Sequence, residues 1–365
     1  MARRRGQRQL AWIGIGTAAL LATACGANDT AGGSGGSGGD AANAKVAFLM
    51  PDTGSTRYEL KDRPGFEKRL KELCPGCQPL YNNADGSADK QQQQFNSALA
   101  QGAKVIVLDP VDSKAAASLV NAAKSKGVKV IAYDRPIPDI PVDFYVSFDN
   151  EKIGKEIATS LIEKIKADGA VPAGSGILIV NGSPTDAAAG LIKKGVHSAA
   201  DSSGLTVLAE YDTIEWKPEN AQKFVSGQLS RFPGKIVGVI AANDGTAGGT
   251  IAAFKAAGVN PTPPVSGNDA TVAGLQLIIA GDQYNTISKP SEIVGGAAAE
   301  VAVALLKGEK PETTGDLFGS PSKLYDPTLV TQDDLKAEII DKKIQTPAEL
   351  CTSEYAAACQ KLGIS

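Results

Sequence analysis

The stretch VIVLDPVDSKAAASLVNAAKSKGVKVIAYDR, residues 105–135, decides the fold. It opens with an apolar run over 105–108, continues as a helix over 113–126 that Gly127 ends, and closes with a second apolar run over 130–133. Apolar runs without polar alternation are typical of strands covered on both faces. Strands that alternate with helices indicate a parallel sheet with right-handed crossovers. The stretch is therefore predicted to be one strand–helix–strand unit of such a sheet.

The same alternation continues in both directions along the chain. Before this unit we expect a strand at 46–50 and helices at 66–73 and 88–101. After Asn150 the rhythm restarts, and the expected elements are helices at 152–166, 187–200, 219–229 and 245–257 and strands at 177–180, 205–209 and 236–241. A chain of 365 residues exceeds the size at which one core usually stops growing. The sequence therefore predicts an α/β fold with two doubly wound parallel-sheet lobes.

Composition excludes several classes of function. The chain has 37 Lys and Arg against 40 Asp and Glu, and a net charge of −3 does not suit a nucleic-acid partner. A single histidine leaves no multi-histidine metal site, and histidine-based catalysis would rest on His197 alone. We therefore expect neither a metal nor a cofactor.

The N-terminal segment is predicted to be an export signal. Four arginines precede an apolar run over 10–24, which is too short for a comfortable transmembrane helix. Small residues lead up to Cys25, as in a bacterial lipobox, so residues 1–24 are expected to be removed and Cys25 lipidated. The alternative is an ordinary signal peptide with an incidental cysteine. Residues 25–44, rich in Gly and Ser, are predicted to be a flexible tether between lipid anchor and folded body.

The remaining four cysteines support export. Cys74 and Cys77 form a C-x-x-C motif around a Pro-Gly turn at the end of a helical pattern. We interpret it as a local structural disulfide in preference to a redox site. Cys351 and Cys359 flank an Ala-rich stretch and are candidates for a second bridge, although the sequence leaves the connectivity open.

Polar and charged residues follow nearly every expected strand. In doubly wound sheets, ligands bind beyond the carboxyl ends of the strands, so these residues are candidates for a binding site. They are Asp52, Arg57, Tyr58, Asp134, Arg135, Asp149, Asn150, Asp186, Trp216, Asn243, Asp244, Asn268, Asp269 and Lys289. For any single Asp or Asn the alternative is helix capping, but capping does not require Arg, Lys or Trp at the same edge.

This set of side chains suits a neutral ligand with many hydroxyl groups. Each sugar hydroxyl both donates and accepts, while Asp accepts, Arg and Lys donate, and Asn does both. Trp216 is the one tryptophan outside the signal segment, and its ring offers an apolar face to a pyranose. The alternative for Trp216 is a partly buried packing residue.

Seven motifs in order resemble the type I periplasmic binding proteins, especially the D-xylose-binding proteins of bacterial ABC importers. They are AYDR (132–135), DFYVSFDNEKIG (143–154), GSPTD (182–186), WKPENA (216–221), ANDGTAGG (242–249), SGNDA (266–270) and SKP (288–290). The resemblance covers roughly residues 45–310.

The resemblance implies two lobes joined by three crossings that close over a sugar. It places 45–147 plus 290–328 in the N-terminal lobe, and 148–289 plus 329–365 in the C-terminal lobe and tail. It also implies a ligand-binding set, which is Arg57, Tyr58, Asp134, Arg135, Asp186, Trp216, Asn243, Asp269 and Lys289. One position departs from the family pattern, because Ala188 stands where an asparagine side chain would contact the ligand.

The function predicted from these features is that of a lipid-anchored, monomeric sugar receptor outside the cytoplasmic membrane. Its expected partners are a monosaccharide, with D-xylose leading, and the membrane subunits of an ABC permease. A sensing receptor for a chemotaxis or two-component partner would have the same pocket. An exported glycosidase that uses a carboxylate pair such as Asp134 and Asp269 is the third alternative, and we do not expect the chain to be an enzyme.

Overall fold

The computed structural model of the chain describes residues 41–55 and 57–364. The expected signal segment, Cys25 and the tether up to residue 40 lie outside the described residues. Across the described part of the chain, none of the helices has the length and apolar character needed to cross a membrane.

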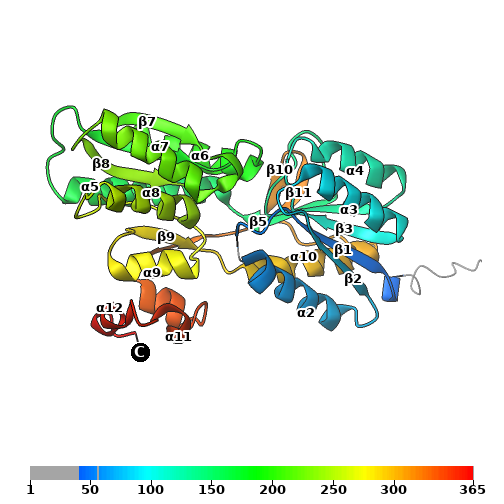
Figure 1. Cartoon of the computed structure of the whole chain (residues 1–365). Helices are drawn as coiled ribbons and strands as arrows, with labels where there is room; N and C mark the ends of the chain where they lie inside the picture. The colour runs from blue at the N-terminus through cyan, green and yellow to red at the C-terminus, as the bar shows by residue number, and fades with distance from the viewer. Residues whose placement is uncertain (1–40, 56, 365) are drawn as a thin grey trace, which may run out of the picture. The chain divides into compact units, whose positions relative to one another are not determined.

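A seven-stranded sheet forms the centre of what we call the first lobe (Figure 1). All neighbouring strands are parallel except β10 and β11. In spatial order the strands are β10 (Gly315–Leu317), β11 (Ser320–Tyr325), β5 (Phe144–Phe148), β4 (Lys129–Tyr133), β3 (Ala103–Leu108), β1 (Lys45–Met50) and β2 (Gln78–Asn83). Its helical segments are η1 (Tyr58–Asp62), α2 (Arg63–Leu73), α3 (Ala88–Ala100), α4 (Ala116–Ser125) and α10 (Ser291–Leu306).

A three-stranded parallel sheet forms the centre of the second lobe. Its strand order is β7 (Thr206–Asp212), β6 (Gly176–Asn181) and β8 (Ile236–Ala241), and Val265 bridges to Val239 in the parallel sense. Its helices are α5 (Asn150–Ala167), α6 (Ala187–Ala200), α7 (Pro218–Arg231), α8 (Asp244–Ala256) and α9 (Val272–Ala280), with a short helical turn η2 (Ile214–Trp216).

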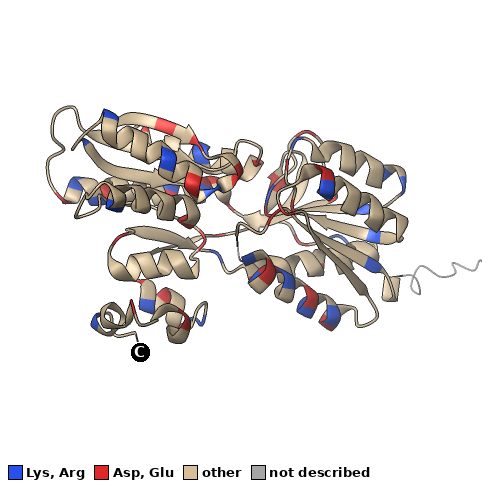
Figure 2. Ribbon diagram, in the orientation of Figure 1, with Lys and Arg blue, Asp and Glu red and all other residues tan. Residues whose placement is uncertain are grey.

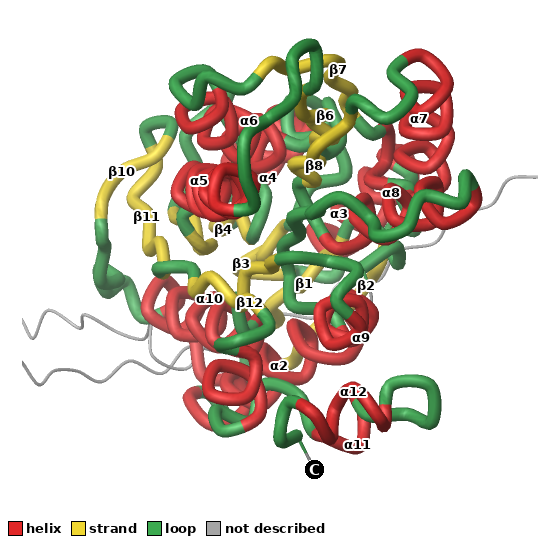
Figure 3. Tube along the Cα trace, turned by 90° about the vertical axis from the view of Figure 1, so that its left-hand side faces the viewer, coloured by secondary structure: helices red, strands yellow, loops and turns green. Residues whose placement is uncertain are grey.

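A third, two-stranded sheet and the C-terminal segment complete this lobe. Strand β9 (Asn285–Ser288) pairs antiparallel with β12 (Thr328–Thr331). The tail holds η3 (Lys336–Ile340), α11 (Pro347–Leu350) and α12 (Ala356–Lys361), and its apolar side chains pack on α9. Figure 3 shows α11 and α12 close to α9. The chain passes between the two lobes after β5, after β9 and after β11.

Both expected disulfides are present. Cys74 bonds to Cys77 at the end of α2, and Cys351 bonds to Cys359 within the tail. The C-x-x-C motif is thus part of a disulfide-closed turn, as the structural interpretation predicted.

The structure differs from the expected elements where apolar patterning is weak. The helix expected from residue 113 is regular from Ala116, and a capped turn precedes it. The Asp112 side chain accepts from the amides of Lys114 and Ala115 in the manner of an N-cap, and the Ala116 amide donates to the Asp112 carbonyl at 3.1 Å. Strand β2 was not predicted, since an edge strand with one exposed face has no apolar run. Helices α9 and α10, both rich in apolar residues, were also not predicted.

Two glycines set the spacing between α5 and α6. A β-carbon on Gly154 would lie 1.9 Å from the carbonyl oxygen of Ile192, and one on Gly195 would lie 2.0 Å from that of Glu151. Both distances are far below ordinary van der Waals contact. The helices therefore approach this closely only because neither position carries a side chain.

Gly195→Ala is expected to lower the free energy of unfolding by about 1–3 kcal/mol, because the added methyl group forces α5 and α6 apart. Gly190→Ala is the matched control in the same helix, where a β-carbon meets nothing within 4 Å. It should leave stability unchanged or raise it by up to about 1 kcal/mol through helix propensity. Urea unfolding of both variants measures the difference, and equal effects would contradict the close helix packing.

Candidate functional site

Acidic residues follow three neighbouring strands of the first lobe at one edge of the sheet. Asp52 comes after β1, Asp109 directly after β3 and Asp134 directly after β4. Charged residues also line α2 (Figure 2), where they pair along the helix surface, as Arg63 does with Glu67. The strand-end acids differ from those surface pairs because the sheet topology brings them together at its carboxyl edge.

Arg135 lies at the centre of this edge, with only 7% of its side chain exposed. Its guanidinium lies 2.9 Å from Asp52, 3.5 Å from Asp109 and 3.3 Å from Asp186 of the second lobe. Burial lowers the pKa of Arg135, but Tyr58 and these carboxylates together raise it well above the ordinary value. Arg135 is therefore a permanent buried cation that links the two lobes.

A second arginine pairs with the acid next to Arg135 in the sequence. Arg57 Nη2 lies 2.6 Å from Asp134 Oδ2, and Arg57 Nη1 lies 3.6 Å from Asp62 Oδ1. Burial by itself raises the pKa of Asp134, but Arg57 and Lys289 outweigh it and hold that pKa below the ordinary value. Asp134 is thus an anion at neutral pH, which suits an acceptor and not a general acid.

The backbone at Asp134 points neighbouring side chains in different directions. Asp134 has φ 56°, and the Arg135 amide donates to the Tyr133 carbonyl at 2.5 Å, which closes a three-residue turn. A positive φ is uncommon for a residue other than glycine, and such strain persists only where the surroundings impose it. Because of this turn, the Asp134 side chain points toward Arg57, and the Arg135 side chain points toward Asp52, Asp109 and Asp186.

Aromatic residues of the first lobe's core support the ion pair between Arg57 and Asp62. The Tyr133 hydroxyl donates to Asp62, which also lies near Arg57 and is hydrogen-bonded to Ser291. The Tyr133 ring packs edge-on against Phe48 at 5.1 Å, and Phe48 stacks on Phe66 at 4.3 Å. Burial raises the pKa of Asp62, although Arg57 opposes that shift. The orientation of Arg57 therefore depends on aromatic packing in the first lobe.

Asp186 connects Trp216 to the first lobe. Asp186 caps α6 by accepting from the Ala188 amide at 2.8 Å, and its Oδ2 accepts from Trp216 Nε1 at 3.0 Å. The indole lies over Gly182, where a β-carbon would come within 2.1 Å of the ring. Glu215 and Trp216 have φ of 56° and 55°. The ring is fixed by a hydrogen bond, a glycine platform and a strained turn.

Asp269 and Lys289 form a third buried ion pair. Their side chains lie 2.9 Å apart and are 10% and 7% exposed. Lys289 follows β9, and Asp269 lies in the loop before α9 with φ 106°. Lys289 acts electrostatically on Asp134, and Asp269 acts on Arg57. This pair therefore shares an electrostatic environment with the first lobe.

The other predicted residues have more local contacts. Tyr58 is buried, and its hydroxyl accepts from Arg135 Nη2 at 3.3 Å. The Asn243 side chain accepts from the Thr246 amide in a capping box, so the capping alternative applies to it. Ala188 is buried in the first turn of α6 and supplies only its backbone amide to Asp186.

The structure thus brings most of the predicted set into one group. Direct contacts connect Tyr58, Arg135, Asp186 and Trp216, and two further ion pairs join Arg57 to Asp134 and Lys289 to Asp269.

Two acids of this group, Asp109 and Asp62, were not among the predicted site residues, and a third, Asp52, was a strand-end candidate outside the ligand-binding set that the resemblance implies. Asp109 follows the strand over 105–108, so the strand-end rule identifies it when applied there. Both of its carboxylate oxygens are buried without a hydrogen-bond partner in the described part of the chain, and burial raises its pKa well above the ordinary value. Asp52 also follows a strand. Asp62 lies at the end of a helical turn, and no sequence signal marks it.

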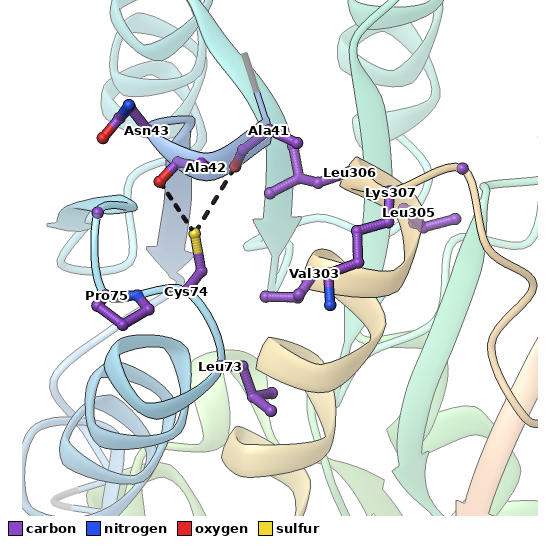
Figure 4. A pocket seen from close by; sticks show the side chains of 12 residues that line it. Ala41, Ala42, Asn43, Leu73, Cys74, Pro75, Val303, Leu305, Leu306 and Lys307 are labelled. Atoms are coloured by element: carbon purple, nitrogen blue, oxygen red, sulfur yellow. Dashed lines mark hydrogen bonds between the residues drawn. The ribbon is translucent and has the colours of Figure 1, made fainter. Parts of the chain in front are cut away.

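Two cavities lie away from this group. One, of about 820 Å³, is lined by apolar residues at the ends of α2 and α10 and by residues 41–43 (Figure 4). There the Cys74 sulfur lies 3.5 Å from the Ala42 carbonyl oxygen. The second, of about 530 Å³, is lined in part by residues 261–264 and 281–284. Neither contains a predicted ligand-binding residue.

The described residues do not bring three or more His, Cys, Asp or Glu together in a way that would hold a metal ion. His197 lies on α6, where Nδ1 is 3.1 Å from Asp201 and Nε2 is 3.1 Å from Glu210. Both ring nitrogens therefore face carboxylates, as in a surface ion pair. The hydrogen bond with Asp201, which has the largest effect, and the one with Glu210 raise the pKa of His197 above its ordinary value of 6.5.

Because the folded state raises this pKa, the His197 interactions stabilise the fold below pH about 6.5, and that contribution is lost as pH rises through the folded value. An NMR titration of the one histidine is expected to give a pKa above 6.5. Asp201→Asn should lower it, whereas Asp341→Asn, on the tail, should not. A value below 6.5 in the unmodified protein would contradict these contacts.

Comparisons with known proteins agree with this architecture. A sequence model of the periplasmic binding protein domain matches residues 46–310. The D-xylose-binding periplasmic protein of Escherichia coli (strain K12) is 34% identical over 318 residues, covering 85% of this chain and 93% of that protein. The multiple sugar-binding receptor ChvE of Rhizobium radiobacter is 29% identical over 287 residues, covering 74% and 80%.

Solved structures give the same result. An ABC transporter solute-binding protein from Clostridium phytofermentans with bound β-D-glucose has a TM-score of 0.75 at 25% identity, with 84% of this chain and 99% of that chain covered. A carbohydrate transporter solute-binding protein from Chloroflexus aurantiacus in complex with D-glucose has a TM-score of 0.72 at 27% identity, with 83% and 97% covered.

The chain belongs to the periplasmic binding protein family. This confirms the predicted fold class of two parallel-sheet α/β lobes. It also confirms the expectation of a binding protein in place of an enzyme, since the curated relatives are named as sugar-binding proteins and the Clostridium phytofermentans structure is that of an ABC transporter solute-binding protein.

Proposed function

We propose that this protein is an extracytoplasmic receptor that binds a neutral monosaccharide, D-xylose or a related sugar, and delivers it to an ABC permease. The observation that carries the proposal is the contact set of Asp186. This carboxylate pairs with Arg135 of the first lobe and accepts from the Trp216 indole of the second. A ligand that reaches both lobes there meets charged hydrogen-bonding groups and an aromatic face together.

The chemistry of the group fits sugar hydroxyls. Arg57, Arg135 and Lys289 supply donors, while Asp134, Asp186 and Asp269 supply ionisable acceptors. Each cation already lies beside a carboxylate, so a neutral ligand adds no charge that would need a partner. The relatives named for D-xylose and for multiple sugars support this ligand class. Asn243 and Tyr58 complete the proposed set, and Ala188 leaves one family hydrogen bond unmade.

We propose that the sugar is enclosed by movement of the two lobes. The proposed N-terminal lobe is 45–147 plus 290–328, and the proposed C-terminal lobe and tail are 148–289 plus 329–365. Contacts between them support this: the Ser113 amide donates to the Thr185 carbonyl at 3.0 Å, and the Ala187 amide donates to the Ser113 hydroxyl at 3.1 Å. A sugar held between the lobes favours the state with these contacts. We propose that the receptor acts as a monomer.

Titration of the mature protein with pentoses and hexoses, followed by calorimetry and Trp216 fluorescence, tests the ligand class. D-xylose or a related sugar is expected to saturate one site. Asp269→Ala leaves Lys289 buried without its partner and should weaken binding by at least about 30-fold. Trp216→Ala should do the same through lost ring contact.

Asp341→Asn is the control, since Asp341 pairs with Lys336 on the exposed tail. It should bind sugar as the unmodified protein does. Saturable binding that survives both Asp269→Ala and Trp216→Ala would place the sugar elsewhere, and the absence of binding to every monosaccharide would refute the proposed ligand class.

We propose that Cys25 carries the lipid that anchors the receptor. In cells labelled with a palmitate analogue, the full-length protein should be labelled and sediment with membranes, whereas Cys25→Ser should be unlabelled. Ser34→Ala, in the same Gly/Ser tether, is the control and should keep the label. Labelled, membrane-bound Cys25→Ser would contradict the anchor.

A further inference from the structure

Asp244 is a buried carboxylate next to two proposed binding residues, yet it faces the protein interior. It follows Asn243, the cap of α8, and it lies against the loop that carries Asp269. Its amide donates to the Asn268 carbonyl at 2.9 Å. The proposed function gives Asp244 no contact with the sugar, so its position requires another explanation.

Four hydrogen bonds reach the Asp244 side chain from three parts of the chain. Oδ1 accepts from Gln283 Nε2 and from Thr286 Oγ1, both at 2.8 Å. Oδ2 accepts from the Thr271 amide at 2.8 Å and from Thr271 Oγ1 at 3.0 Å. Because every one of these bonds ends on a carboxylate oxygen, the geometry requires an acceptor at both positions.

Two glycines leave room for this carboxylate and no more. A β-carbon on Gly267 would lie 2.3 Å from Asp244 Oδ1, and one on Gly274 would lie 2.3 Å from Oδ2. The carboxylate is therefore enclosed between the segment before Asp269 and the first turn of α9.

The loop that Asp244 holds is the one that aims Asp269 at Lys289. Asp269 and Ala270 have φ of 106° and 45°, so the backbone is strained at the ligand-binding position itself. The Ala270 amide donates to Thr286 Oγ1 at 3.2 Å, and Thr286 also donates to Asp244. The strain is thus balanced by hydrogen bonds that converge on the Asp244 carboxylate.

An anionic carboxylate at this place is electrostatically unfavourable. Burial, followed by the charge of Asp269, raises the pKa of Asp244 to about 7. Asp269 is the charged group that acts on it, and Asp269 is itself paired with Lys289. The side chains bonded to the Asp244 carboxylate are neutral: Thr271 from the loop, Gln283 from the turn before β9 and Thr286 from β9. Folding is opposed by this ionisation, so the carboxylate is retained at a cost to stability.

We propose that Asp244 is a positioning residue for ligand binding, whose carboxylate holds the strained 268–271 loop and so orients Asp269. This rests on the proposed sugar site, to which Asp269 belongs. A proton on Asp244 turns one acceptor into a donor that faces the donors of Gln283 or Thr271. The loop is then released, and sugar affinity falls as pH falls through the titration of Asp244.

Hydrogen exchange of the ligand-free protein tests the loop directly. At pH 8, Asp244→Asn is expected to speed amide exchange in peptides spanning 268–274 by at least about tenfold, because the Thr271 amide loses its charged acceptor. Asp341→Asn should leave these peptides unchanged. Unchanged protection in Asp244→Asn would overturn the proposal whatever the result of sugar titration. Because this exchange experiment uses no sugar, failure of the positioning role can be told apart from failure of the proposed sugar-binding function.

The pH dependence of sugar affinity distinguishes a positioning role from a purely structural one, because a purely structural role would not change it. In the unmodified protein the dissociation constant for D-xylose is expected to rise by up to about tenfold per pH unit below pH 7. Asp244→Asn should bind weakly at pH 8 and lose this slope. A flat profile in the unmodified protein, or a slope retained in Asp244→Asn, would contradict the proposal even if the variant folds poorly.

Discussion

A buried guanidinium, that of Arg135, is the constraint on which the site depends. Removing it from water is costly unless carboxylates surround it, and those carboxylates must come from several strand ends at once. Asp52 and Asp109, which follow strands of the parallel sheet, and Asp186 of the second lobe supply these carboxylates. Because buried ion pairs add little net stability, this arrangement indicates a site organised for binding.

Backbone strain occurs at the same places as the buried charges. Among the described residues, eight that are not glycine have positive φ, and five of them are Asp134, Glu215, Trp216, Asp269 and Ala270. Three of these five are proposed ligand contacts, and Glu215 and Ala270 are their chain neighbours, which suggests pre-organised side chains at the site. The neighbouring cores, with Phe48 and Phe66 below Tyr133 and the tail packed on α9, supply the rigidity that maintains it.

The sequence predicts the sheets well because their strands are continuous apolar runs, as at 105–108 and 177–180. It predicts the site partly, because Asp134 and Arg135 come directly after an apolar strand. Asp62 and Asp244 show the limit. Asp62 lies on a helical turn, and Asp244, although it was a strand-end candidate, looks like an ordinary first-turn acid of α8. Their partners, Tyr133 and Thr286, are 71 and 42 residues away in the chain, so only the tertiary fold reveals what they hold.

A crystal structure of the mature protein with D-xylose is the sharpest test of the proposed binding site. We expect one sugar between the lobes, with its ring face on Trp216 and its hydroxyls within hydrogen-bond distance of Arg135 and Asp269. A sugar bound elsewhere, for example in the apolar cavity beside Cys74, with Arg135 and Asp269 still paired only to protein groups, would contradict it.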